Sequence, residues 1–282
     1  MTPDALQHWI QHNSSEELKL FWTAPWLEIQ LNRPAQRNAL NGTILQKLRQ
    51  VFDIVEASST IRAVILTGGE GQFCSGADLQ EISQLRASGA QALVLNNKNY
   101  GELLHRMHLC RVPVIALVDG PALGGGMGLT CASDFILSTD NASFGMPEPK
   151  LGIIAGQIMP YVFRKLGLVK TQEMALQGLR ITGQTAQTWG LSTIYCPSHK
   201  ELRERLVSLL ENILACGPLA IEQTKSILNI LEPVSANKIN ETAQQVVAAT
   251  LSAEGVEGTM AFLTKRKPKW NQKQEMESHD AG

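Results

Sequence analysis

The chain has no run of apolar residues long enough to cross a membrane. Its longest clearly apolar run, residues 112–118, is far shorter than the ~20 residues that a bilayer requires. The first twenty residues carry Asp4, Glu16 and Glu17 and no apolar core, so a secretory signal is not expected. Neither sign of charge is in excess, because 25 Lys and Arg balance 26 Asp and Glu. We therefore expect neither a membrane nor a nucleic-acid partner.

Cysteine is scarce and unpatterned. The chain has five cysteines, an odd number, and no CxxC pair, which argues against a disulfide framework and a structural zinc site. His105 and His108 share a helix face, but no third ligand lies near them in sequence. A solvated helix surface is therefore favoured over a metal site there. We expect no metal and a reducing, cytoplasmic environment.

The common nucleotide and hydrolase motifs are also absent. The sequence has neither a GxxxxGK[ST] phosphate loop nor a GxGxxG turn after a strand, which removes the usual support for NTP hydrolysis and dinucleotide binding. It lacks the GxSxG turn of many hydrolases. With 282 residues, 44% hydrophobic and 18% charged, the composition is nonetheless that of an ordinary globular protein.

Patterns of strand and helix alternate along the first half of the chain. Residues 26–31 alternate apolar and polar side chains, as a half-buried strand does, and residues 41–56 repeat apolar residues every three or four positions, as an amphipathic helix does. Short apolar runs at 62–67, 112–118 and 134–138 predict buried strands. Strands separated by crossovers predict a mostly parallel α/β sheet covered by helices.

Beyond residue 156 the pattern predicts helices only. The expected helices lie roughly at 157–167, 169–177, 184–189, 200–215, 218–230 and 237–265. We divide the chain into a partly mobile N-terminal extension (1–25), an α/β core (26–200), a helical C-terminal subdomain (201–270) and a flexible tail (271–282).

Two segments each join a buried strand, a glycine loop and the start of a helix. They are residues 73–79 (FCSGADL) and 121–127 (PALGGGM). The first amides of a helix lack intrahelical partners, and glycine lets another group approach them closely. Two such amides that converge would form an oxyanion hole for a thioester, each donor contributing ~3–4 kcal/mol to a transition state. The alternative is that the glycines only allow tight turns.

Further motifs follow one another in a recognisable order. They are 33–40 (RPAQRNAL), 73–79, 113–116 (PVIA), 124–126 (GGG), 144–148 (FGMPE), 151–153 (LGI), 181–186 (ITGQTA) and 262–268 (FLTKRKP). Together they resemble the enoyl-CoA hydratase/isomerase (crotonase) family over about residues 20–270. The resemblance implies a crotonase-like spiral of ββα units, a helical C-terminal trimerisation region, and a homotrimer or dimer of trimers.

The same resemblance implies where substrate binds. The amides of Ala77 and Gly125 would hold the thioester oxygen of an acyl-CoA. The CoA would be lined, mostly by backbone groups, by Arg37, Ala39, Ala77, Asp78, Leu79, Gln80 and Gly125. Coenzyme A would be part of the substrate, with no tightly bound cofactor and a role in fatty-acid metabolism.

The carboxylates depart from the family pattern. Related hydratases carry two glutamates, and this chain has Gly128 at the first position and Glu148 at the second. Hydration needs a base for water and an acid for C2, which one carboxylate can supply in a syn addition, whereas an isomerase needs only one base. Residues 126–129, 151–154 and 159–162 resemble a bacterial subgroup of hydratases, which favours hydration with Glu148 as acid and base.

The sequence leaves two other functions open. One is an isomerase or another acyl-CoA reaction, such as decarboxylation, that uses Glu148 alone. The other is an acyl-CoA-binding scaffold without catalysis.

Burial would raise the pKa of Glu148. Asp78 is expected to begin a helix rather than act as a base, and Cys74 and Ser75 are expected to pack.

Overall fold

The structure is a computed structural model that describes residues 2–69, 71–230, 253–254, 257, 261 and 264–269. The chain forms two compact units, Met1–Ser208 and Leu209–Gly282. Helix α8 (His199–Ala215) ends in the second unit, and α9 (Pro218–Ile230) lies within it. Both helices were predicted from the sequence, at 200–215 and 218–230. The predicted tail, and most of the predicted helix at 237–265, lie outside the described residues.

The larger sheet of the first unit carries the strands that lead to the glycine loops. It has the order β1-β2-β3-β4-β6-β9. The strands are β1 (Leu18–Thr23), β2 (Trp26–Leu31), β3 (Ala63–Gly68), β4 (Val114–Val118), β6 (Phe135–Ser138) and β9 (Ile194–Tyr195). Only β1 and β2 pair antiparallel. The predicted parallel α/β sheet is confirmed, and β4 is buried along its whole length, as a central strand should be.

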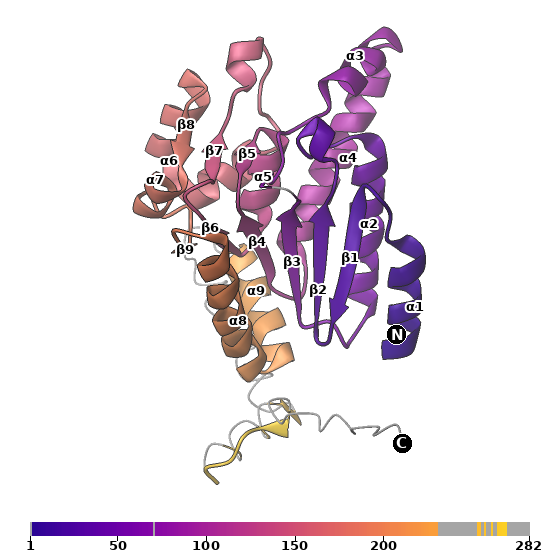
Figure 1. Cartoon of the computed structure of the whole chain (residues 1–282), viewed down its shortest axis with the longest axis vertical. Helices are drawn as coiled ribbons and strands as arrows, with labels where there is room; N and C mark the ends of the chain where they lie inside the picture. The colour runs from indigo at the N-terminus through magenta and orange to yellow at the C-terminus, as the bar shows by residue number, and fades with distance from the viewer. Residues whose placement is uncertain are drawn as a thin grey trace. The chain divides into compact units, whose positions relative to one another are not determined.

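A second, smaller sheet has three strands, β5 (Pro121–Leu123), β7 (Ser143–Gly145) and β8 (Arg180–Thr182), in the order β5-β7-β8. Figure 1 draws β5 and β7 above β4 and β6, beside α5 (Gly125–Ala132). The sequence analysis did not predict these strands. Three residues are too few to show the period-two alternation on which such a prediction depends.

Helices cover the larger sheet. Figure 1 shows α2 (Gly42–Ala57) and α4 (Ala90–Leu109) behind β1, β2 and β3. The others are α3 (Leu79–Ala87), α6 (Met159–Gln177), α7 (Gly183–Thr188) and the 3₁₀ turns η1 (Pro34–Gln36) and η2 (Glu148–Leu151). The predicted apolar face of α2 is buried, and the Asn41 side chain caps the helix by accepting from the Ile44 amide at 2.8 Å. Gly167 breaks the helical backbone of α6 between the two helices predicted there.

The expectation of a loose N-terminal extension is wrong for most of residues 1–25. Helix α1 (Pro3–Asn13) and strand β1 form there, and Leu6, Ile10 and Leu18 belong to the hydrophobic core. The reason is that the sheet and α2 already provide most of the core. A few apolar residues, spaced among polar ones, are then enough to fix this segment to it. None of the helices that the structure describes is long and apolar enough to span a bilayer.

Candidate active site

Backbone pairing brings the two predicted glycine loops together. The Cys74 amide donates to the Pro121 carbonyl, and the Leu123 amide donates back to the Cys74 carbonyl, both at 2.9 Å. Further along the first loop, the Leu40 amide donates to the Gly76 carbonyl at 2.8 Å. The first two of these backbone bonds join the two loops at Cys74 and Leu123, before the segment that contains Gly125.

The amides of Ala77 and Gly125 are neighbours at these loops. A methyl group placed on Gly125 would lie 3.6 Å from the Ala77 nitrogen, and one placed on Gly76 would lie 3.3 Å from the Gly125 nitrogen. Gly125 begins α5, so its N–H has no partner inside the helix. Within the described part of the chain, neither amide donates to a backbone carbonyl. Both residues line a cavity of about 530 Å³, where two free donors can bind one oxygen.

Glu148 brings a carboxylate to the same cavity. It is the first residue of η2, and a methyl group placed on Gly124 would lie 2.9 Å from its Oε1 atom. Its Oε2 atom is buried and has no hydrogen-bond partner among the residues that the structure describes. Burial raises the pKa of Glu148, the direction that the sequence predicted. A carboxyl group in this state can exchange protons nearer to neutral pH than an exposed one.

Position 128 has no carboxylate and no room for one. A side chain added to Gly128, within α5, would overlap the hydroxyl of Tyr100 and the side chain of Ile158. Tyr100 comes from α4 and Ile158 immediately precedes α6, so two other elements fill this volume. Tyr100 could not be predicted from the sequence, since no motif surrounds it and its partners lie elsewhere in the chain. Glu148 therefore lacks a carboxylate partner at the position where related hydratases have one.

Gly128→Ala is expected to lower the free energy of unfolding by about 1–3 kcal/mol, because the added methyl group overpacks a filled volume. Urea or thermal unfolding measures the change. Gly156→Ala is the matched control, since a methyl group there would meet only the tip of Ile154, at 3.9 Å, among the described residues. An unfolding midpoint for Gly128→Ala equal to that of the control would contradict the packing.

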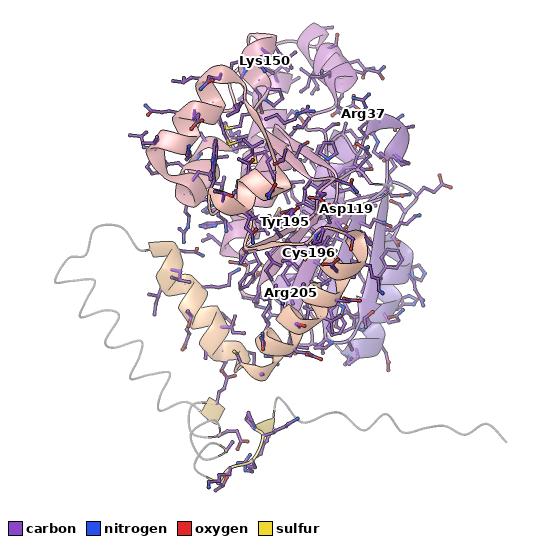
Figure 2. The ribbon with its side chains drawn as sticks, turned by 60° about the vertical axis from the view of Figure 1, so that its left-hand side comes forward. Arg37, Asp119, Lys150, Tyr195, Cys196 and Arg205 are labelled. Carbon is purple, nitrogen blue, oxygen red and sulfur yellow. The ribbon has the colours of Figure 1, made fainter. Side chains whose placement is uncertain are left out.

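The cavity extends from the amide pair along the segment expected to bind CoA. Its wall includes every residue predicted for that role, namely Arg37, Ala39, Ala77, Asp78, Leu79, Gln80 and Gly125. Figure 2 shows Arg37 and Lys150, the latter from η2, toward the top of the view. The structure thus places all the predicted site residues around one space.

Arg33 ties two parts of this wall together. Its guanidinium donates to the Ala39 carbonyl at 2.7 Å and pairs with the Asp78 carboxylate at 3.1 Å. Asp78 also accepts from the amides of Gln80 and Glu81, at 3.1 and 3.4 Å, and so begins α3 as predicted. A carboxylate engaged in both an ion pair and a helix cap is poorly suited to act as a base.

Three further sequence candidates, Cys74, His105 and His108, do not line this cavity. Cys74 is fully buried, and burial raises the pKa of its thiol to about 12, so the reactive thiolate is not formed near neutral pH. His105 lines a separate cavity of about 670 Å³, and His108 packs edge-on against Tyr161 with ring centres 5.5 Å apart. Over the described residues, no three His, Cys, Asp or Glu side chains gather as a metal site requires.

Known proteins resemble the chain over most of its length. The family model for enoyl-CoA hydratase/isomerase matches residues 24–273. The 2,3-dehydroadipyl-CoA hydratase of Escherichia coli is 33% identical over 244 residues, which cover 86% of this chain and 93% of that protein. Carnitinyl-CoA dehydratase of Proteus mirabilis is 31% identical over 264 residues, covering 91% and 98% of the two chains.

Solved structures agree. AtuE of Pseudomonas aeruginosa has a TM-score of 0.89 at 38% identity and covers 91% of this chain and 100% of its own. An enoyl-CoA hydratase/isomerase of Marinobacter aquaeolei has a TM-score of 0.88 at 35% identity, covering 92% and 100%. These likenesses confirm the crotonase-like α/β fold predicted from the sequence. The chain is an enzyme that belongs to the enoyl-CoA hydratase/isomerase family.

Proposed function

We propose that the protein adds water across the 2,3 double bond of an enoyl-CoA thioester. Ala77 and Gly125 serve as oxyanion donors, and Glu148 serves as both base and acid. The observation that carries this proposal is the position of the Glu148 carboxylate against the glycine loop whose Gly125 amide is free. Relatives named as hydratases, such as the Escherichia coli protein, support hydration as the class of reaction.

The two amides act on the thioester carbonyl. As water adds at C3, the π electrons of C2=C3 move into the C1–C2 bond and those of the carbonyl move onto oxygen. The oxygen therefore gains charge between ground state and transition state, and hydrogen bonds to it strengthen as it does so. Each fixed donor contributes ~3–4 kcal/mol to this step. The position of Gly125 at the start of α5 adds the favourable end of a helix dipole.

Glu148 handles the proton. Its carboxylate takes one proton from water, the O–H bond breaks, and the oxygen bonds to C3. The enolate then collapses, C2 takes the proton from the Glu148 carboxylic acid, and the carboxylate is restored. The product is a 3-hydroxyacyl-CoA, formed by syn addition because both transfers use one carboxyl group. A raised pKa suits a group that must both accept and return a proton.

As the pH is lowered, the reaction rate should begin to fall at a pH that is high for a reaction that depends on a glutamate. Glu148 must be ionised in the free enzyme to activate water, and burial raises its pKa. We expect kcat/KM to fall as pH decreases, with an apparent pKa above the ordinary value of a glutamate. A pH–rate profile with crotonyl-CoA, checked against circular dichroism at each pH, measures it. An acid limb at or below the ordinary glutamate value in folded protein would contradict the assignment.

Isomerisation is the second candidate, and the packing above Gly128 is the observation that favours it. Moving a double bond from C3 to C2 requires one base, which removes a proton from C2 and returns one to C4. Of the two carboxylates that line the cavity, Asp78 is tied to Arg33, which leaves Glu148. A single free carboxylate is sufficient for this chemistry.

One assay separates the possibilities. Purified protein is incubated with crotonyl-CoA and, separately, with a 3-enoyl-CoA. The products are separated by liquid chromatography against 2-enoyl-CoA and 3-enoyl-CoA standards, which distinguishes the isomers, and hydration is identified by mass. Conversion of crotonyl-CoA to a product heavier by one water supports hydration. Migration of the 3-enoyl double bond without hydration of crotonyl-CoA replaces the proposal with isomerisation. Saturable CoA binding without turnover of either substrate would leave an acyl-CoA-binding scaffold.

We also propose that CoA lies along the wall formed by Arg37, Ala39 and residues 77–80, and that the protein assembles as a homotrimer or dimer of trimers. The family resemblance implies that backbone groups make most of the contacts with CoA, so single side-chain changes should weaken CoA binding only modestly. Light scattering of the purified protein measures the assembly directly.

A further inference from the structure

The segment that supplies the Gly125 amide, at the start of α5, is rich in glycine. Glycine occupies four of the five positions from 124 to 128. Gly124 adopts φ of +51°, in a region that favours glycine. Glycine has the widest conformational freedom of any residue, so contacts from outside the loop must fix it. A donor helps catalysis only when it is held in place before the reaction begins.

Tyr100 supplies such a contact. Its hydroxyl donates to the Gly125 carbonyl with an O···O distance of 2.5 Å. That carbonyl and the proposed donor N–H belong to the same residue, on the two peptide groups that flank the Gly125 Cα, so the bond restricts rotation of the residue that carries the donor. The same hydroxyl lies 3.5 Å from the point where a methyl group on Gly125 would sit, and the Ala77 nitrogen lies 3.6 Å from that point. Tyr100 therefore borders the amide pair itself.

The anchor behind this contact is firm. Tyr100 belongs to α4, whose Leu103, Leu104 and Met107 are buried, and its own ring packs against the core. Burial raises the pKa of the Tyr100 hydroxyl well above its ordinary value. The hydroxyl thus keeps the proton that it donates throughout the working pH range. The same atom fills the space above Gly128, so the absence of a side chain at 128 is what admits it.

We propose that Tyr100 is a positioning residue of the active site, whose hydroxyl holds the Gly125 carbonyl and so fixes the backbone of Gly125 with its amide hydrogen toward the thioester oxygen. This inference rests on the proposed oxyanion role of Gly125. It also gives Gly128 a purpose, because any larger residue there would displace the hydroxyl from the Gly125 carbonyl.

Tyr100→Phe removes the hydroxyl and keeps the ring. We expect kcat for crotonyl-CoA to fall by about 10- to 100-fold, since small misplacement of a catalytic group has effects of this size. KM should change by no more than about twofold, because the residues proposed to bind CoA, Arg37, Ala39 and residues 77–80, are unchanged. Tyr161→Phe, at a nearby half-buried tyrosine outside the site, is the matched control and should keep its activity. Equal kcat in both variants would overturn the proposal, as would a loss in Tyr100→Phe confined to KM.

A spectroscopic readout separates positioning from a general effect on structure. In Glu148→Gln, bound crotonyl-CoA should persist, and the infrared stretch of its thioester carbonyl should shift to lower frequency under the two amides. Adding Tyr100→Phe should reduce that shift, while adding Tyr161→Phe should not. A full shift in the Glu148→Gln/Tyr100→Phe variant would overturn the proposed role of Tyr100 but not the oxyanion site. No shift in Glu148→Gln itself would instead overturn the oxyanion site on which the inference rests.

Discussion

Replacing Glu148 with glutamine is expected to lower kcat for crotonyl-CoA by about 10²–10⁴-fold, the range that general acid–base catalysis supplies. Glutamine has nearly the same shape but cannot accept a proton from water or return one to C2. Position 128 supplies no second carboxylate, and Asp78, the other carboxylate among the described residues that line the cavity, is paired with Arg33. CoA binding should change little, because Glu148 is not among the residues proposed to bind CoA, which are Arg37, Ala39 and residues 77–80.

Two controls make this result specific. Glu204→Gln changes an exposed glutamate of α8, 62% exposed and outside the cavity, and should leave turnover unchanged. Calorimetric titration with CoA should give similar affinities for the parent and Glu148→Gln. If Glu148→Gln turns over crotonyl-CoA at nearly the parent rate, Glu148 has no part in the mechanism and another base must be sought.

Gly125→Pro is expected to reduce turnover further than Gly125→Ala by about 10²–10³-fold, the usual cost of losing one oxyanion donor. Proline has no amide hydrogen, whereas alanine keeps it. Gly125 is the first residue of α5, the position at which a helix tolerates proline best. The comparison therefore isolates the N–H group from the added bulk.

The bulk itself is tolerable. A methyl group on Gly125 would lie 3.3 Å from the end of the Leu40 side chain and 3.5 Å from the Tyr100 hydroxyl, contacts that small side-chain movements relieve. Steady-state kinetics of both variants, with circular dichroism to verify folding, provides the measurement. Equal kcat for folded Gly125→Pro and Gly125→Ala would show that this amide does not bind the oxyanion.

The sequence predicted the elements that carry their own periodicity. Strands β2, β3, β4 and β6 and helix α2 appeared within one or two residues of their bounds, because their apolar residues follow a strand or helix period over several positions. The small sheet escaped prediction because its strands have three residues each and depend on partners distant in sequence. Helix α1 was missed for a related reason, since its burial depends on the sheet that it covers.

The site divides in the same way. Ala77, Gly125 and Glu148 could be predicted as site residues because local motifs surround them, and the structure places them around one cavity. Tyr100 and Arg33 act through contacts that no local pattern encodes: Tyr100 reaches the Gly125 carbonyl from α4, and Arg33 reaches Asp78 across the cavity wall. Position 128 was recognised as a departure from the family pattern, but what fills its space became visible only in three dimensions.

The most direct test of the account is a crystal structure of Glu148→Gln with crotonyl-CoA bound. We expect the nitrogens of Ala77 and Gly125 to lie about 2.7–3.1 Å from the thioester oxygen, the separation of working oxyanion donors. The substituted carboxamide should lie beside C2 and C3. A thioester oxygen that contacts neither amide, or an enoyl group on the far side of the cavity from residue 148, would contradict the account.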